Sequence, residues 1–168
     1  MAQGRGQSGG AGRGAGGWQL FYFKPFKMAL DQLEADVTRL AKRDPAGYRT
    51  HANTRLLASV YRAITQQVPA NPDHPDFRLG KALGGNYTNW RREKQGLPDR
   101  YRLFFRFASS PVKLIVYVWF NDDDTLRKAG AKTDVYAVFR RMLERGVVPD
   151  SIGALLEFSD ESDLILRK

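Results

Sequence analysis

The stretch that decides the fold is RYRLFFRFASSPVKLIVYVWF, residues 100–120, in which two strand patterns flank a turn. Residues 100–107 alternate in character, as expected for a strand whose side chains point to opposite faces with a period of two. One face carries Tyr101, Leu103, Phe105 and Phe107. Residues 113–120 form a nearly unbroken apolar run, which is typical of a central strand buried on both faces. The SSP triplet between the two runs predicts the turn.

The opposite face of residues 100–107 carries Arg102 and Arg106 on either side of Phe104. A face that only met water would be served by almost any polar residue. Arginines beside aromatic rings are instead typical of surfaces that bind phosphates and bases. The sequence therefore predicts a strand that anchors the fold with one face and holds a substrate backbone with the other.

Two helices are predicted on the N-terminal side of this stretch, after a short strand at WQLFYF, residues 18–23. The apolar stripe of the first helix comprises Leu30, Leu33, Val37, Leu40 and Ala41. The stripe of the second comprises Leu56, Val60, Ala63 and Ile64. Asp44-Pro45 and Val68-Pro69 end these patterns, because proline disfavours continuation of a helix. A turn-rich connector, residues 71–76, and a broken strand over residues 77–95 follow.

On the C-terminal side, an aspartate of residues 122–124 is predicted to cap a short helix at residues 125–130, and residues 134–146 form the last clear helix. Residues 151–168 fit no single pattern. The order of elements predicts an α+β fold, a small antiparallel or mixed sheet with the two N-terminal helices packed on one face and a C-terminal helix. The opposite face of the sheet would be comparatively open and lined by the arginines of residues 100–107.

Composition sets limits on the class of protein. The chain has 168 residues, of which 42% are hydrophobic, so we expect one domain with a real core. No apolar run approaches the roughly 18 residues of a membrane span, and no signal-peptide stretch is present. The chain has no cysteine, which excludes disulfides, zinc–thiolate sites and cysteine nucleophiles and fits a cytoplasmic protein. Residues 1–17 contain eight glycines and are predicted to be a disordered leader.

The formal net charge of +9 points to a polyanionic partner, with nucleic acid first and an acidic protein second. The basic residues are concentrated between Arg78 and Arg106, where eight of them face only two acidic residues. A plain solvated surface is the competing interpretation of this cluster.

Metal chemistry has little support in the sequence. His51 and His74 lack partners at ligand spacing, so both are interpreted as ordinary histidines. Asp122, Asp123 and Asp124 are adjacent and cannot all point one way, so helix capping is favoured over a metal site. No metal and no cofactor is predicted.

Several motifs, in order and spacing, resemble the YhaV family, toxins of bacterial type II toxin–antitoxin pairs within the RelE-like superfamily. They are GKALGG (80–85), WRR (90–92), RYRLFFR (100–106), WFNDDDTLRKAG (119–130) and KTDVYAVFRRMLERG (132–146). The resemblance covers residues 17 to about 149, so we expect a RelE-like toxin domain over residues 18–150. The glycine-rich leader is an addition, and the tail after Pro149 lacks the histidine expected near the family's C-terminus.

The resemblance implies a toxin that stops translation by cutting mRNA, either free or on the ribosome, and that is held in check by an AbrB-like antitoxin of PrlF type. Any contact with DNA would be made through the antitoxin. RNA can be cut without a metal when its 2′-hydroxyl attacks the adjacent phosphorus, provided that charge is stabilised and protons are transferred.

The catalytic candidates are assigned by chemistry and by likeness to the superfamily. Arg102 matches the strand arginine that contacts phosphate in RelE-like toxins, and Arg127 resembles the arginine after the last strand. Tyr136 resembles the C-terminal tyrosine, which could stack on a base or take the 2′-hydroxyl proton. Arg92 shares a strand face with Lys94, the better proton-transfer candidate because an arginine effectively cannot lose its proton.

The remaining predicted RNA contacts are Lys81, Trp90, Arg91, Arg106 and Lys132. Competing structural roles stay open for several candidates. Tyr136 could flank the core, Arg127 could support the C-terminus of its short helix, and Trp90 could belong to the core of the sheet. A non-catalytic RNA- or ribosome-binding module and a DNA-binding regulator are the alternatives to an endoribonuclease.

Overall fold

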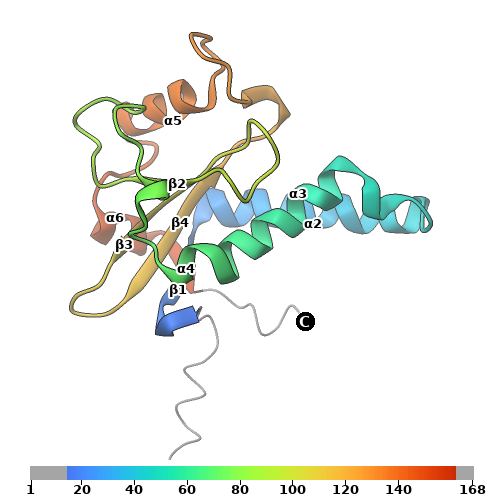
Figure 1. Ribbon diagram of the computed structural model, residues 1–168, viewed down its shortest axis with the longest axis horizontal. Helices are drawn as coiled ribbons and strands as arrows, with labels where there is room; N and C mark the ends of the chain where they lie inside the picture. Colours follow the sequence, from blue (N-terminus) through green and yellow to red (C-terminus); the bar gives the residue numbers. More distant parts are fainter. Residues whose placement is uncertain (1–14, 162–168) are drawn as a thin grey trace, which may run out of the picture.

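The computed structural model describes residues 15–161, which form a five-stranded mixed sheet flanked by helices (Figure 1). The strands are β1 (Gln19–Phe23), β2 (Arg91–Glu93), β3 (Leu103–Ala108), β4 (Leu114–Phe120) and β5 (Ser159–Glu161). Their spatial order is β2-β3-β4-β1-β5. The central strand β4 pairs antiparallel with β3 and parallel with β1. The predicted α+β class and the central position of residues 113–120 are confirmed.

The helices are α2 (Lys24–Arg43), α3 (Ala52–Arg62), α4 (Val68–Ala70), α5 (Val135–Glu144) and α6 (Ile152–Glu157). A π-helical segment, Ala63–Gln67, joins α3 to α4. Short 3₁₀ turns lie at Ala15–Gly17, Tyr48–Thr50, Pro75–Phe77 and Asp123–Thr125. Figure 1 shows α2 and α3 running side by side and projecting well beyond the sheet. None of the helices within residues 15–161 is long and apolar enough to cross a bilayer.

The first core layer lies between the sheet and the long helices, as predicted. Phe26, Leu30 and Leu33 recur on one side of α2, and Leu56 and Val60 recur on α3. These side chains pack against alternate residues of the strands, namely Leu20, Tyr22, Leu103, Phe105, Ile115 and Tyr117. The alternation predicted for residues 100–107 is confirmed, because Tyr101 and Phe107 also contact this layer.

The other face of the sheet is covered, and the prediction that it would be open was wrong. A second core layer of α5, α6 and the segment 79–90 packs on it. Its buried members include Leu83, Trp90, Phe104, Phe139 and Leu155, and Phe104 stacks on Phe139 with centroids 4.1 Å apart. The apolar stripe of α5 demands a surface to bury against, and this face of the sheet supplies it.

A bulge in β4 shapes the edge of this second layer. Phe104 pairs with Trp119 and Phe105 pairs with Tyr117, so Val118 has no partner in the register. Val118 and Trp119 therefore both contact the second core layer. The Trp119 ring stacks on Phe139 at a centroid distance of 5.8 Å. The bulge thus places the Trp119 ring beside Phe104, and both rings stack on Phe139 of α5.

Two local expectations need correction. Residues 125–130 form no helix, and the 3₁₀ turn Asp123–Thr125 lies just before them with Asp122 as its N-cap. Asp122 does cap that turn, since its carboxylate accepts a bond from the amide of Asp124 at 3.0 Å. Within residues 77–95 the regular strand is only β2, with a bridge between Arg78 and Arg91.

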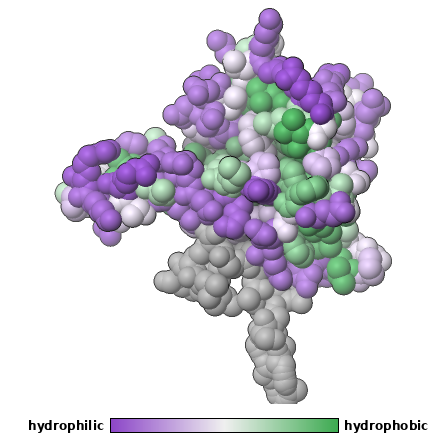
Figure 2. Space-filling model, turned by 180° about the vertical axis from the view of Figure 1, so that it is seen from behind, coloured by the Kyte–Doolittle hydropathy of each residue, from purple (hydrophilic) through white to green (hydrophobic). Residues whose placement is uncertain are grey.

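The unassigned C-terminal segment contributes to the sheet. α6 packs in the second core layer through Leu155, and β5 pairs antiparallel with β1 at the sheet edge. Of the predicted leader, residues 1–14 lie outside the described residues. From behind, α2 and α3 present a mainly hydrophilic surface, and hydrophobic surface gathers on the body (Figure 2). Val147 and Phe158 are exposed apolar side chains of that body.

Candidate active site around Tyr136

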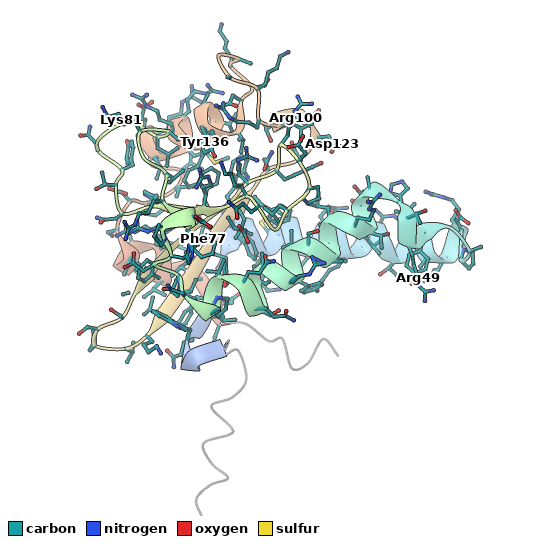
Figure 3. All side chains as sticks on the ribbon, viewed as in Figure 1. Arg49, Phe77, Lys81, Arg100, Asp123 and Tyr136 are labelled. Carbon is teal, nitrogen blue, oxygen red and sulfur yellow. The ribbon has the colours of Figure 1, made fainter. Side chains whose placement is uncertain are left out.

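Four of the five catalytic candidates meet at the phenol of Tyr136. Arg92 and Arg102 each donate a bond from Nε to the phenol oxygen, at 2.9 Å and 3.0 Å. The guanidinium carbons of Arg102 and Arg127 lie 5.9 Å and 5.0 Å from the centre of its ring. The side chains come from β2, from the residue before β3, from the loop after β4 and from the first turn of α5. Figure 3 shows Tyr136 in the body of the molecule, far from Arg49 at the tip of the long helices.

Tyr136 is fixed by the start of α5. Asp134 is the N-cap of this helix, and its carboxylate accepts bonds from the amides of Tyr136 and Ala137 at 3.1 Å and 3.4 Å. The Tyr136 ring meets Phe104 edge to face, with centroids 5.9 Å apart. Only 7% of Tyr136 is exposed, so its position is set by packing as well as by its polar contacts.

Asp134 also orders Arg127. The carboxylate accepts bonds from Nη1 of Arg127 and from the amide of Lys128, both at 2.6 Å. Burial by itself would raise the pKa of Asp134, but the bonds from Arg127, Lys128 and Tyr136 outweigh burial and hold the pKa below its ordinary value. Asp134 is therefore a buried carboxylate whose charge is balanced by Arg127 and helix amides.

Arg102 is held by a buried amide side chain. It lies just before β3, not at mid-strand as predicted, and its backbone amide donates to Oδ1 of Asn121 at 2.8 Å. Asn121 is 1% exposed, and its Nδ2 donates to the carbonyls of Arg100 and Thr125. Asn121 thus ties the start of β3 to the loop that carries Arg127.

Arg92 is oriented by backbone carbonyls. Its Nη1 donates to the carbonyl oxygens of Asp76 and Arg78, at 3.1 Å and 2.8 Å. These contacts satisfy hydrogen bonds without neutralising the guanidinium charge. Arg102 is similar, since its Nη1 donates to the carbonyl of Tyr101. In the part of the chain that the structure describes, neither Arg92 nor Arg102 forms an ion pair.

The positive charges of Arg92 and Arg102 are therefore not neutralised by a carboxylate among residues 15–161. Two Nε atoms bonded to one oxygen lie within about 6 Å of each other. Two unit charges at that distance repel by on the order of 1–3 kcal/mol at the effective dielectric constants of partly exposed sites. An anion between the two guanidinium groups would relieve this repulsion, and a phosphate offers the paired oxygens that their fork geometry fits.

A cavity of about 440 Å³ opens next to Tyr136. It is lined by Ala82, Arg127, Asp134, Tyr136, Ala137, Arg140, Arg141 and Glu144. Arg140 and Arg141 were not among the predicted site residues. Their spacing of four residues from Tyr136 and Ala137 puts them on the same side of α5, which is the signal that could have identified them.

Lys94 does not join the contacts at Tyr136. It follows β2 and is half-buried, and within residues 15–161 its side chain makes no hydrogen bond or ion pair. Lys81 and Lys132 are exposed on the two loops near α5. Lys81 is seen on its loop at the top of Figure 3.

Three residues predicted to contact RNA have partners within the fold. Trp90 has no exposed surface and donates from Nε1 to Asp150 at 2.7 Å, so its ring offers no face to a base. Arg106 donates to the carbonyl of Asp150 and lies over the Trp90 ring. Arg91 lies over Phe107, on the side of the sheet away from Tyr136.

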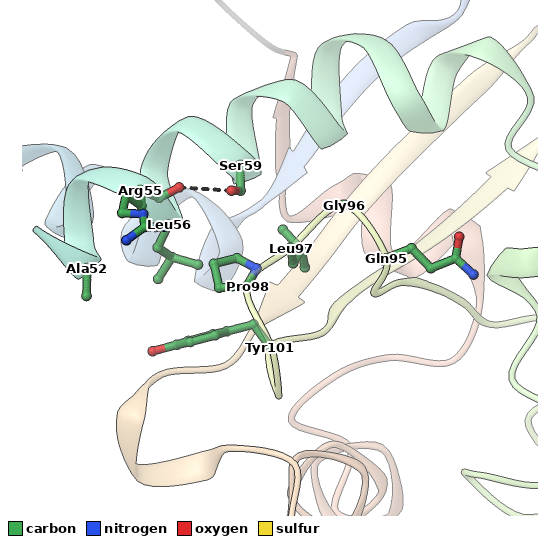
Figure 4. Close-up of a pocket in the computed structure, with 9 residues that line it drawn as sticks. All are labelled: Ala52, Arg55, Leu56, Ser59, Gln95, Gly96, Leu97, Pro98 and Tyr101. Carbon is green, nitrogen blue, oxygen red and sulfur yellow. Dashed lines mark hydrogen bonds between the residues drawn. The ribbon is translucent and has the colours of Figure 1, made fainter. Parts of the chain in front are cut away.

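A separate cavity of about 370 Å³ lies between α3 and residues 95–98 (Figure 4). Leu56, Leu97 and Pro98 form apolar walls, with Tyr101 at one side. Burial and the hydrogen bond to Asp123 raise the pKa of Tyr101, so its phenol stays protonated. Arg55 is its one cationic lining residue, so the cavity does not present the several converging cations found at Tyr136.

Comparison with known proteins bears on this site. A family model described as a toxin with endonuclease activity, of a toxin–antitoxin system, matches residues 20–160. The chain is 44% identical over 147 residues to toxin YhaV of Escherichia coli O6:H1, covering 87% of this chain and 94% of that protein. It is 43% identical, with the same coverage, to ribonuclease toxin YhaV of E. coli K12. No solved structure matches the chain. The chain therefore belongs to the YhaV family of toxins with endonuclease activity from toxin–antitoxin systems.

Proposed function

We propose that the surroundings of Tyr136 are the active site of a metal-independent endoribonuclease that cleaves mRNA. The single observation that carries this proposal is the convergence of Arg92 and Arg102, both without a carboxylate partner in residues 15–161, on one phenol oxygen. Such an arrangement is costly for the folded protein and suits a phosphodiester, whose charge grows in the transition state.

The reaction balances without a further reactant. The 2′-oxygen of a ribose forms a bond to the adjacent phosphorus while the bond from phosphorus to the 5′-oxygen breaks. The 2′-hydroxyl proton passes to a base, and the 5′-oxygen takes a proton from an acid. The products are a 2′,3′-cyclic phosphate and a 5′-hydroxyl end. Arg92, Arg102 and Arg127 stabilise the negative charge on the phosphoryl oxygens.

Tyr136 is suited to the role of acid. Its oxygen accepts two bonds from arginines, so its own hydrogen is the one left to donate outward. Lys94 does not join the contacts at Tyr136, so it takes the 2′-hydroxyl proton only if the bound RNA brings the ribose to it and the amine is neutral. Asp134 acts through Arg127 and Tyr136 and is a positioning residue.

The proposal that no metal is needed rests on the side chains around Tyr136. Cations already supply the charge stabilisation, and Asp134 has its carboxylate oxygens bound to Arg127 and to backbone amides. Across residues 15–161 no cluster of three histidine, aspartate or glutamate side chains could hold a metal ion.

Cleavage of end-labelled single-stranded RNA in EDTA tests the proposal, with and without ribosomes. We expect products with 2′,3′-cyclic phosphate ends, and a rate that falls by about 10²–10³-fold in Arg102→Ala. Arg55→Ala, an exposed arginine of α3 away from Tyr136, is the matched control and should cleave normally. If RNA binds but stays intact both with and without ribosomes, the protein is a non-catalytic RNA-binding module and the proposal is wrong.

The same cationic site is the proposed target of the antitoxin. An acidic segment of a PrlF- or AbrB-like partner that covered Arg92 and Arg102 would occupy the phosphate positions and block RNA. In this proposal the protein acts in the cytoplasm and meets DNA only through the antitoxin complex. Crosslinks from the antitoxin that avoid this site would contradict direct coverage.

A further inference from the structure

We propose that the cavity on the outer side of α5 holds the sugar–phosphate of the nucleotide next to the one that reacts at Tyr136, and that Arg141 is its phosphate contact. This inference rests on the proposed function, because it places the reacting phosphate at Tyr136. The ligand is single-stranded RNA, bound through its backbone with its bases directed outward.

The cavity and the reaction site share two walls. Tyr136 and Arg127 line the cavity of about 440 Å³ and also belong to the arginine–tyrosine cluster. An RNA chain with one phosphate beside Tyr136 and Arg127 would therefore have its neighbouring nucleotide close to this cavity. Arg141 follows Tyr136 by five residues, which places it about 7.5 Å farther along the axis of α5.

Arg141 is the lining arginine whose positive charge has no carboxylate partner within residues 15–161. Arg127 is balanced by Asp134 at 2.6 Å, and Arg140 is balanced by Glu144 at 3.0 Å. Arg141 donates from Nη2 to the carbonyl of Lys132 at 2.7 Å and forms no ion pair within residues 15–161. That bond ties its guanidinium to the loop that carries Arg127, and a carbonyl partner leaves its charge available for an anion.

The shape of the cavity favours a backbone over a base. Ala82 and Ala137 supply its small walls, and the only aromatic ring in the lining, Tyr136, is already covered by the guanidinium groups of Arg102 and Arg127. A base would find no free ring to stack on, whereas a ribose and a phosphate would find guanidinium donors. The contact should therefore show no base preference.

Binding of a 2′-O-methyl RNA octamer, which cannot be cut by 2′-hydroxyl attack, tests the inference without needing turnover. Fluorescence anisotropy would compare wild type with Arg141→Ala and with Arg145→Ala, the matched control. Arg145 is an exposed arginine at the C-terminus of α5 that does not line the cavity. We expect Kd to rise about tenfold in Arg141→Ala. A plot of the logarithm of the association constant against the logarithm of the salt concentration has a negative slope, and the magnitude of this slope should decrease by about 0.7 in Arg141→Ala. Arg145→Ala should change neither Kd nor this slope.

A variant that fills the cavity provides a second, independent binding experiment. Ala137→Leu keeps the charge and a good helix former while occupying the space, so its Kd for the octamer should rise by a similar factor. Its affinity for a dinucleotide, which spans only the Tyr136 site, should stay unchanged. If Arg141→Ala and Ala137→Leu bind the octamer as tightly as Arg145→Ala does, the inference is wrong. If binding changes as expected but wild type cuts no natural RNA, the catalytic proposal fails and this binding site stands.

Discussion

Arg92 and Arg102 are held side by side because the Nε atom of each donates to the same phenol oxygen, at 2.9 Å and 3.0 Å. One arginine comes from the edge strand β2 and the other from the start of β3, so the bond partner of both lies outside the sheet, on α5. Tyr136 thus holds two like charges side by side, and in the proposed mechanism both contact one phosphate.

Replacing Tyr136 by phenylalanine tests this arrangement. The ring and its edge-to-face contact with Phe104 remain, but the oxygen that orders both arginines and donates a proton is lost. We expect kcat for RNA cleavage to fall by about 10²–10³-fold, with binding of uncleavable RNA weakened far less. Tyr48→Phe is the matched control, since Tyr48 also lies beside a guanidinium, that of Arg49, but in the turn Tyr48–Thr50 between α2 and α3. Equal kcat values for wild type and Tyr136→Phe would remove the phenol from the mechanism.

Asn121 is predicted to position Arg102. Its side chain joins the amide of Arg102 to the carbonyls of Arg100 and Thr125 in a buried setting. Asn121→Ala leaves these groups without partners, so the free energy of unfolding should fall by about 2–4 kcal/mol. We also expect kcat to drop at temperatures where the variant is fully folded, because Arg102 loses its anchor.

A comparison variant separates the two effects of Asn121. Val60→Ala removes buried volume from the opposite core layer and should cost a similar stability without touching Arg102. Urea unfolding would match the two variants, and steady-state kinetics below their unfolding transitions would compare them. A kcat for Asn121→Ala equal to that of Val60→Ala would reduce Asn121 to a purely structural residue.

The sequence predicted that cationic side chains from separate segments would lie together, and the structure shows this for four of the named residues. Arg92, Arg102, Arg127 and Tyr136 were named from their residue types and motifs, and four separate segments bring them together. The open sheet face was wrong because the periodicity of residues 134–146 predicts a helix but not the face on which it packs. Phe104 was thus assigned beside solvent, although Phe139 stacks on it.

The supporting residues were missed for a related reason. Asn121 and Asp134 act through bonds to backbone groups that are distant in sequence or belong to loops, and only the folded chain brings these together. Asp134 did carry a local signal, since an aspartate before an apolar helical pattern is a typical N-cap. Trp90 was left between two roles, and its complete burial places it in the core.

The pH dependence of stability tests the role of the Asp134 carboxylate. Its pKa is lower in the folded protein than its ordinary value near 4, so the carboxylate contributes stability that is fully present above about pH 4. That contribution is lost as the pH falls through the folded-state pKa, because the unfolded chain binds the proton more readily. Asp134→Asn keeps the volume and the capping oxygen but not the charge. The difference in unfolding free energy between wild type and Asp134→Asn should therefore shrink between pH 5 and pH 2, as measured by urea titration at each pH. Asp99→Asn, an exposed aspartate, should show no comparable convergence with wild type.

Asp150 is predicted to support the fold and not RNA binding. Its Oδ1 accepts the bond from the buried Nε1 of Trp90 at 2.7 Å, and its carboxylate lies 3.9 Å from Arg106. The ion pair adds little, because the Asp150 side chain is largely exposed. The loss of an acceptor for a buried indole matters more, and Asp150→Ala should lower the unfolding free energy by about 1–2 kcal/mol.

The conservative variant decides which feature of Asp150 is needed. Asp150→Asn retains an acceptor for Trp90 and removes the charge, so it should recover most of the stability lost in Asp150→Ala. Both variants should cleave RNA with the KM of wild type when assayed well below their unfolding temperatures. An increase in KM in Asp150→Ala that Asp150→Asn reverses would instead mean that Trp90 or Arg106 moves to meet the substrate. That result would support the RNA contacts predicted for these two residues.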